Sequence, residues 1–393
     1  MEALQQFQQY ERFLRSICKV LGFDVLSRDW RKTFRTYLSI FLISLYCFCM
    51  MYSIVIAVDT FELLKSLAFL GFFFQCSIKV YYTIAKSHMY STSFEGLQSA
   101  IYTDHLGGTE QQRAVITRII RLVLILTRTT TVLYTSSLFI FSLYPAYMYF
   151  VVDVKVTIFP LYVPGIDIYS AYGYGITNSM HMVFAVYGLL GAVTSDTAFM
   201  MYVLHIVTYA ELFEIECERF SQDLSDACQQ WEPHLVEYGQ FCRDRMRSLY
   251  GFHQNMIAYI ERVTQCYEGI CVVEVATCSF SIMFNLFLAL TTDWYATYSF
   301  LVVSWFQLFI YSLLGTVMQT TIDRLNTEVT RLPWYMLPND EQQRFWFMLT
   351  RSQMPGEITI RSVGPLNMET FTNIMQKIYS AFTMMYSFLD DLS

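Results

Sequence analysis

The sequence predicts an all-α membrane protein with seven spanning helices, a cytoplasmic N-terminus and an extracellular C-terminus. Two observations support this fold class. Hydrophobic residues make up 54% of the 393 residues and charged residues only 15%, whereas a soluble domain carries about 25% charged residues. Basic residues also gather in alternate loops between apolar stretches, and this asymmetry sets the side of the membrane on which each loop lies.

Seven stretches are long and apolar enough to be spans, since crossing a bilayer takes about 20 mostly apolar residues. Stretches 37–58 and 294–321 carry no charge, whereas 370–389 is the most polar of the seven. No linker divides the chain, which indicates a single membrane domain. The predicted spans cover residues 37–58, 63–84, 122–152, 181–210, 271–290, 294–321 and 370–389.

The distribution of Lys and Arg gives the orientation. The N-terminal segment holds seven of them, and the three loops on its side hold four, five and five, whereas the opposite side holds only Lys155. Cytoplasmic loops carry the excess of basic residues, so the N-terminus is predicted inside and the C-terminus outside. Segments 211–268 and 322–369 are then cytoplasmic, and we expect anchor-type helices there. Apolar stripes outside the bilayer need a partner, which is either one another or a second subunit.

Motifs of catalysis and metal binding are absent from the sequence. There is no phosphate-binding loop, no H-E-x-x-H and no paired C-x-x-C, and the six histidines have no ligand spacing. The ten cysteines fall in predicted helices or on the cytoplasmic side, where thiols stay reduced. We therefore expect no enzyme, no catalytic residue, no metal and no cofactor.

Charged residues within spans often mark function, and five of them fall in the predicted spans before the last one. Lys65 and Lys79 lie near the ends of the second span, and Arg128 and Glu274 lie near cytoplasmic ends. For these four we expect side chains that reach the interface, or contacts at it. Asp196 is deeper. The sequence leaves two interpretations of it open: a hydrogen bond between helices, or a direct part in the response to a ligand.

One face of the last predicted span is polar, and the other is apolar. A helix places residues three and four apart on one face. Such a stripe suits helix packing or the wall of a water-filled path, and we interpret it as a pore wall. A single helix cannot enclose a channel, so this interpretation requires several subunits. The polar face consists of Asn373, Gln376, Lys377, Ser380, Thr383 and Ser387.

The outer halves of spans two, three, four and six are rich in aromatic and small residues. Core packing accounts for most of these residues singly. Together they are typical of an apolar cavity with a few hydroxyl groups, the usual composition of a small-ligand site. The candidate ligand-binding residues are Phe69, Phe73, Phe74, Tyr134, Ser137, Phe141, Tyr144, Tyr187, Gly188, Gly191, Tyr298 and Trp305.

The C-terminal sixty or so residues resemble those of insect odorant receptors, which are seven-helix proteins with this inverted topology. Weaker likeness covers the rest of the chain. Arg361 and Ala381 depart from the family pattern, which often has a small and an aromatic residue there. The motifs that carry the resemblance are Trp334-Tyr335-Met336-Leu337, Arg351-Ser352-Gln353-Met354-Pro355, Pro365-Leu366-Asn367-Met368-Glu369-Thr370-Phe371 and Tyr379-Ser380-Ala381-Phe382-Thr383.

The resemblance implies an odorant-binding subunit of a heteromeric, ligand-gated, non-selective cation channel in the plasma membrane of olfactory sensory neurons. Four subunits would surround one pore within the lipid bilayer, and the shared odorant receptor co-receptor would complete the assembly. The ligand would be a small volatile odorant, and no nucleic acid takes part. The implied pore and gate residues are Lys377, Ser380, Thr383, Met384, Ser387 and Phe388.

The alternative function is a seven-helix chemoreceptor of another class, either gustatory-type or G-protein-coupled, or a membrane transporter. Such a receptor would work through a cytosolic partner, whereas a channel would conduct without one.

Overall fold

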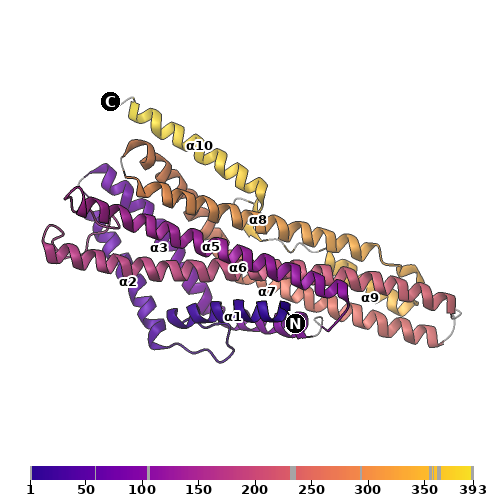
Figure 1. The fold of residues 1–393 in the computed structure, drawn as a ribbon. Coiled ribbons are helices and arrows are strands. Elements are labelled where there is room, and N and C mark those ends of the chain that lie inside the picture. Colours follow the sequence, from indigo (N-terminus) through magenta and orange to yellow (C-terminus); the bar gives the residue numbers. More distant parts are fainter. Residues whose placement is uncertain are drawn as a thin grey trace.

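Long helices lie side by side in the computed structural model of the chain (Figure 1), which describes residues 2–57, 59–103, 107–230, 236–292, 294–353, 356, 358–360 and 364–390. Seven of the helices in these ranges correspond one to one to the seven predicted spans. They are α2 (Phe34–Ile56), α3 (Thr60–Ala85), α5 (Glu110–Phe150), α6 (Ala171–Gln230), α7 (Val236–Thr291), α8 (Ala296–Thr330) and α10 (Met368–Asp390).

Helices α2, α3, α6, α7 and α8 are apolar and long enough to cross a membrane. Helices α5 and α10 are more polar, but with 41 and 23 residues they also have the length that a bilayer core of about 30 Å requires. The most extensive contacts between two helices join α3 to α7, α5 to α6, and α7 to α8. The predicted all-α class and the seven predicted helices are therefore present.

Shorter elements complete the chain. They are α1 (Glu2–Leu21), α4 (Ser87–Leu97), the π-helix η1 (Gln98–Thr103), the 3-10 helix η2 (Trp334–Met336), α9 (Asn339–Ser352) and the antiparallel pair of β1 (Thr359–Ile360) with β2 (Gly364–Pro365). Helix α1 is amphipathic, and it buries Phe7, Tyr10 and Leu14 against the bundle. We call the end of the bundle with the 151–170 connection the loop end, and the opposite end the α9 end.

Helices α6 and α7 continue beyond the predicted spans 181–210 and 271–290 and project together at the α9 end (Figure 1). Their apolar stripes face each other within the chain. Leu212 and Leu224 of α6 are fully buried, and the rings of Phe213 and Phe252 stack with centroids 5.9 Å apart. The sequence left two partners open for these stripes, either one another or a second subunit. In the structure the stripes pack against one another.

The start of α10 is fixed by a close approach to α8. A Cβ atom on Gly315 of α8 would lie 1.9 Å from the backbone oxygen of Leu366, so only glycine fits at this position. Asn367 and Thr316 add hydrogen bonds to this junction, because Thr316 Oγ1 accepts the backbone N–H of Met368 and Asn367 donates to Gln319. The last helix is thus attached firmly at its first turn.

Two hydrophobic clusters form the core. The larger one joins α1, α4 and η1 to the long helices and extends to the α9 end. The smaller one lies at the loop end, where Phe69, Phe141 and Phe159 pack ring against ring at centroid distances of 5.3–5.9 Å. The connection 151–170 covers this cluster, since Ser66 Oγ donates to the backbone oxygen of Pro160.

Candidate ligand-binding site

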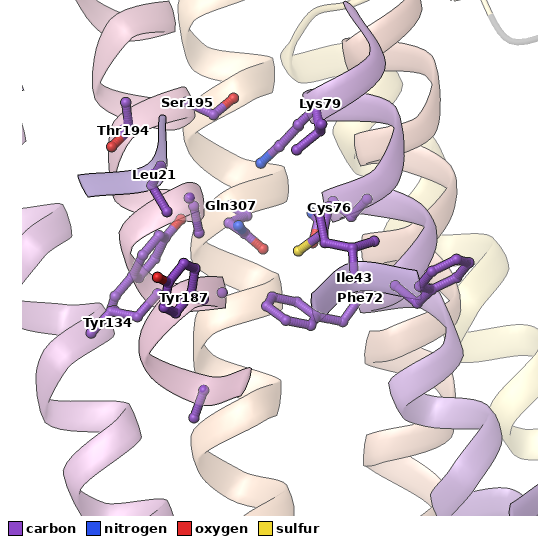
Figure 2. A pocket seen from close by; sticks show the side chains of 18 of the residues that line it. Leu21, Ile43, Phe72, Cys76, Lys79, Tyr134, Tyr187, Thr194, Ser195 and Gln307 are labelled. Carbon is purple, nitrogen blue, oxygen red and sulfur yellow. The ribbon is translucent and has the colours of Figure 1, made fainter. Parts of the chain in front are cut away.

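A cavity of about 260 Å³ lies inside the bundle, with walls from α1, α2, α3, α4, α5, α6, α7 and α8. Its surface is mostly apolar and aromatic, with a few polar side chains among them. Figure 2 shows Lys79 and Cys76 of α3 extending toward Gln307 of α8, with Tyr134 and Tyr187 on the opposite side. A concave apolar site with a small number of placed polar groups is the usual form of a small-molecule site.

Most of the candidate residues named from the sequence line this cavity. They are Phe69, Phe73, Tyr134, Ser137, Phe141, Tyr187, Gly188 and Gly191. Four others do not line it. Phe74, Tyr298 and Trp305 have 50%, 50% and 43% of their surface exposed on the outside of the chain, and Tyr144 packs against the smaller hydrophobic cluster.

Other lining residues were not among the candidates. Phe72, Cys76 and Lys79 follow one another on one face of α3 at the helical spacing of four and three residues, so periodicity starting from Phe69 would have found them. Gln307 of α8 lies in the predicted span 294–321 but was not named as a candidate. The lining residues of the N-terminal segment, Leu14, Cys18, Leu21, Phe23, Val25 and Leu26, had no such signal.

Three charged side chains meet next to the cavity. Lys79 Nζ lies 2.7 Å from Asp196 Oδ1 and 3.0 Å from Glu274 Oε2, and all three side chains are less than 10% exposed. This ion cluster joins α3, α6 and α7. The expectation that Lys79 and Glu274 reach the membrane interface is wrong, because each finds its counter-charge inside the bundle. Arg128 lies exposed on the surface of α5.

Asp196 is the most strongly bound member of the cluster. Besides Lys79, three side chains donate hydrogen bonds to it: Tyr134 at 2.6 Å, Gln307 at 3.1 Å and Tyr311 at 2.9 Å. Of the two interpretations that the sequence left open, the structure shows the hydrogen bond between helices. Lys79, Tyr134 and Gln307 also line the cavity. A ligand that contacts one of them would therefore touch a residue that is bound directly to Asp196.

The electrostatics of the cluster are unbalanced, because two carboxylates face one ammonium group. Removing one partner of a buried ion pair costs about 3–5 kcal/mol, since the other charge is left without compensation. The hydrogen bonds from Tyr134, Gln307 and Tyr311 compensate Asp196 in part. A cluster of this kind is rigid. Its excess negative charge disfavours a further anionic group nearby.

The two faces of α10 differ as the sequence predicts. Ile374 and Ile378 are buried against the rest of the chain, and α10 contacts both α7 and α8. On the polar face, the residues named for the pore and gate are exposed, namely Lys377, Ser380, Thr383, Met384 and Ser387. The side chain of Phe388, the remaining predicted gate residue, lies outside the described residues.

Helix α8 links the cavity to α10. Gln307 faces the cavity, whereas Trp305 and Phe309 lie on another face of α8 and stack on each other. Both of these rings contact Phe371 of α10, with centroids 6.2 and 5.9 Å apart. A displacement of α8 at Gln307 therefore acts on the first turns of α10.

Comparisons with known proteins identify relatives over nearly the whole chain. A family model described as 7tm odorant receptor matches residues 59–379. The putative odorant receptor 83c of Drosophila melanogaster is 24% identical over 390 residues, which cover 97% of each chain. Odorant receptor 10 of Aedes albopictus is 24% identical over 139 residues, 34% of this chain and 36% of the relative.

Solved structures have the same fold. The insect olfactory receptor OR5 from Machilis hrabei superposes with a TM-score of 0.77 at 13% identity, covering 98% of this chain and 99% of that one. Its complex with eugenol gives a TM-score of 0.78 at 14% identity, covering 98% of this chain and 100% of that one. At such identities the likeness shows the arrangement of the helices.

Proposed function

We propose that this chain, which belongs to the 7tm odorant receptor family, binds a small volatile odorant in its internal cavity and is a subunit of a ligand-gated cation channel. The observation that supports odorant binding is the cavity itself: a mostly apolar space inside the bundle beside a small set of fixed polar groups. One protein with this fold was solved in complex with eugenol. The family model and the relatives named above are described as odorant receptors.

The polar face of α10 supports the channel part of the proposal. Lys377, Ser380 and Thr383 are exposed on the single chain, while Ile374 and Ile378 attach the helix to the bundle. Several copies of such a helix, one from each subunit, would enclose a water-filled path. We propose that Met384, Ser387 and Phe388 form its outer gate, and that the co-receptor shared within the family supplies the other subunits of a heterotetramer.

The proposed orientation follows from the basic residues. The α9 end lies in the cytoplasm and the loop end outside, in the plasma membrane of an olfactory sensory neuron. Segments 211–268 and 322–369 then form the cytoplasmic part of the subunit interface. Their buried stripes are already covered within the chain, so the interface uses the exposed aromatic side chains Tyr335, Trp346 and Phe347.

Binding would open the pore through α8. A ligand in the cavity displaces the Gln307 side of α8, and Trp305 and Phe309 transmit this displacement to Phe371 of α10. A ligand shifts the equilibrium between closed and open states only by its difference in affinity for the two. Contacts at Gln307 and Lys79 that differ between the two states would provide that difference.

The experiment records currents from cells that express the chain together with the co-receptor while volatiles are applied. We expect an agonist-evoked cation current that persists when G-protein signalling is blocked. Cells with the co-receptor alone are the control. A chain that reaches the surface but gives no current with any volatile, or a current that disappears with the G-protein block, would contradict the proposal.

A further inference from the structure

The lining of the cavity extends along the helices beyond the outer half of the bundle. Its lining runs along α3 from Ala68 to Thr83, a rise of about 22 Å at 1.5 Å per residue. On α6 it runs from Phe184 to Tyr202, about 27 Å by the same measure. A volume of about 260 Å³ spread along this lining has room for an extended chain.

We divide this length at Lys79 and Gln307 into an outer and an inner compartment. The outer compartment lies at the loop end, between Phe69, Phe141 and Phe159. The inner compartment lies beyond Lys79 on the side of the α9 end, and its walls include Val80 and Ala198. It is closed by the N-terminal segment, whose lining residues are Leu14, Cys18, Leu21, Phe23, Val25 and Leu26.

The N-terminal wall of the inner compartment is fixed by hydrogen bonds. Tyr10 Oη donates to the backbone oxygen of Thr197 on α6 at 3.0 Å. Ser39 Oγ on α2 donates to the backbone oxygen of Leu21 at 2.8 Å. Both donors are buried. The inner compartment is thus a built part of the fold, formed by α1 and the α1–α2 connection against the bundle.

Polar groups gather where the two compartments meet. Lys79 and Gln307 point into the cavity there (Figure 2). An ammonium group has three N–H donors, and the contacts of Lys79 with carboxylates in the described chain are those with Asp196 and Glu274. One donor therefore remains for an oxygen acceptor on a ligand. The surplus carboxylate of the ion cluster repels an anion, which selects an uncharged acceptor.

We infer that the cavity takes a linear, uncharged aliphatic molecule with an oxygen acceptor part-way along its chain, such as a long-chain ester or ketone. The acceptor lies at Lys79 and Gln307, one alkyl arm lies in the outer compartment and the other in the inner compartment against the N-terminal segment. This inference rests on the proposed odorant-binding function and names the class of ligand.

The experiment uses photolabelling of the full chain in membranes, which needs no channel current. The probe is a linear ketone with a diazirine at each end of its chain. We expect two sets of adducts, one near Phe69 and Phe73 and one between Leu14 and Leu26, and both should disappear when an excess of the unmodified ketone is added. Adducts confined to the outer compartment, or N-terminal adducts that the ketone does not reduce, would overturn the inference.

A matched pair of variants tests the inner compartment. Ala198→Phe places a ring in that space, so N-terminal adducts should fall at least about tenfold while outer adducts remain. Leu224→Ala changes a fully buried residue that does not line the cavity, and both sets of adducts should stay. Surface labelling confirms that each variant folds. Equal losses at the two sites in Ala198→Phe would also overturn the two-compartment arrangement.

Chain length and charge provide a second measurement that does not depend on any variant. Affinity in competition with the probe should rise about fourfold for each added methylene until the cavity is full, and a carboxylic acid of the same length should compete at least tenfold more weakly than the ketone. A flat length series, or an acid as strong as the ketone, contradicts the inference. If compact volatiles evoke currents but do not compete with the ketone, the proposed function stands and the ligand class is wrong.

Discussion

Lys79 Nζ lies 2.7 Å from Asp196 Oδ1 in the interior of the bundle, and this contact joins α3 to α6 across 117 positions of sequence. Glu274 of α7 lies on the other side of the same ammonium group, 3.0 Å away. One positive charge therefore faces two negative ones. Because of this imbalance, the three residues are not equivalent when each is replaced.

Lys79→Met should destabilise the protein far more than Asp196→Asn or Glu274→Gln. The lysine variant leaves two buried carboxylates without a counter-charge, at a cost of about 3–5 kcal/mol, whereas either carboxylate variant leaves one neutral pair. The melting temperature of the detergent-solubilised chain and its surface level measure the difference. Equal losses in all three variants would mean that the cluster is not held together by charge.

Phe73→Ala and Tyr187→Ala should each weaken agonist potency about tenfold or more while maximal current and surface level change little. Both side chains line the cavity, and losing apolar contact with a small ligand costs about 1–3 kcal/mol. Tyr144→Ala is the control, because Tyr144 packs against the smaller hydrophobic cluster but does not line the cavity itself. The cavity is the wrong site if the control shifts the dose-response curve as much as the other two variants do.

The sequence predicts those features of this molecule that depend on local periodicity. The buried Ile374 and Ile378 and the exposed Ser380 and Thr383 of α10 follow from their spacing alone. The density of aromatic residues in the outer halves of the spans also identified Phe69 and most of the other residues that line the outer part of the cavity. Local patterns such as these survive folding because each concerns one helix.

Features that depend on distant contacts could not be predicted in this way. Lys79 near the end of a span looks like a side chain that reaches the interface, and only the fold brings Asp196 and Glu274 beside it. The same holds for Leu14 and Leu21, which line the cavity although they precede the first span. Trp305 was named as a candidate ligand-binding residue because it is aromatic, but it lies on the face of α8 that contacts Phe371 of α10.

The stability of the α9 end should depend on pH through His253. Burial, together with the nearby Arg351 charge, lowers the pKa of His253 from 6.5 to about 4. The unfolded chain binds a proton below pH 6.5 that the folded chain binds only near pH 4. Stability from the neutral imidazole is thus complete above pH 6.5 and is lost as the pH falls toward 4, by roughly 3 kcal/mol in total.

His253→Gln should therefore flatten the pH dependence of the melting temperature between pH 6.5 and 4, compared with the native chain in the same detergent. His88 offers the control, since it lies outside the hydrophobic core, exposed on α4. His88→Gln should leave the slope as it is. Parallel curves for the native chain and His253→Gln would contradict the assignment.

An epitope tag after Ser393 should be stained on intact cells, and a tag before Met1 only after permeabilisation. The reason is the excess of Lys and Arg in the N-terminal segment and in the loops on its side, with Lys155 alone on the other. Both tagged chains should be compared at equal total expression. The reverse staining would exclude the proposed channel as well as the orientation.

Cysteines introduced on the polar face of α10 should react with a water-soluble thiol reagent applied from outside. Ser380, Thr383 and Ser387 are exposed on this face, and they would line the proposed water-filled path. The thiolate is the reactive form and needs water, so a cysteine at Ile378, which is 6% exposed and packed against the bundle, should be protected. Labelling is measured as the rate at which the agonist current is modified.

The depth of each position predicts a further difference. Met384 lies between Ser380 and Ser387 along the helix, so a gate there limits access to Ser380 more than to Ser387. Agonist should therefore speed labelling of a cysteine at Ser380 by a larger factor than at Ser387. The native cysteines of the described chain all lie outside α10, so the parent chain without an introduced cysteine is the control. Equal rates at Ser380 and Ile378 would show that α10 packs on both faces, and the pore would then have to be formed by another helix.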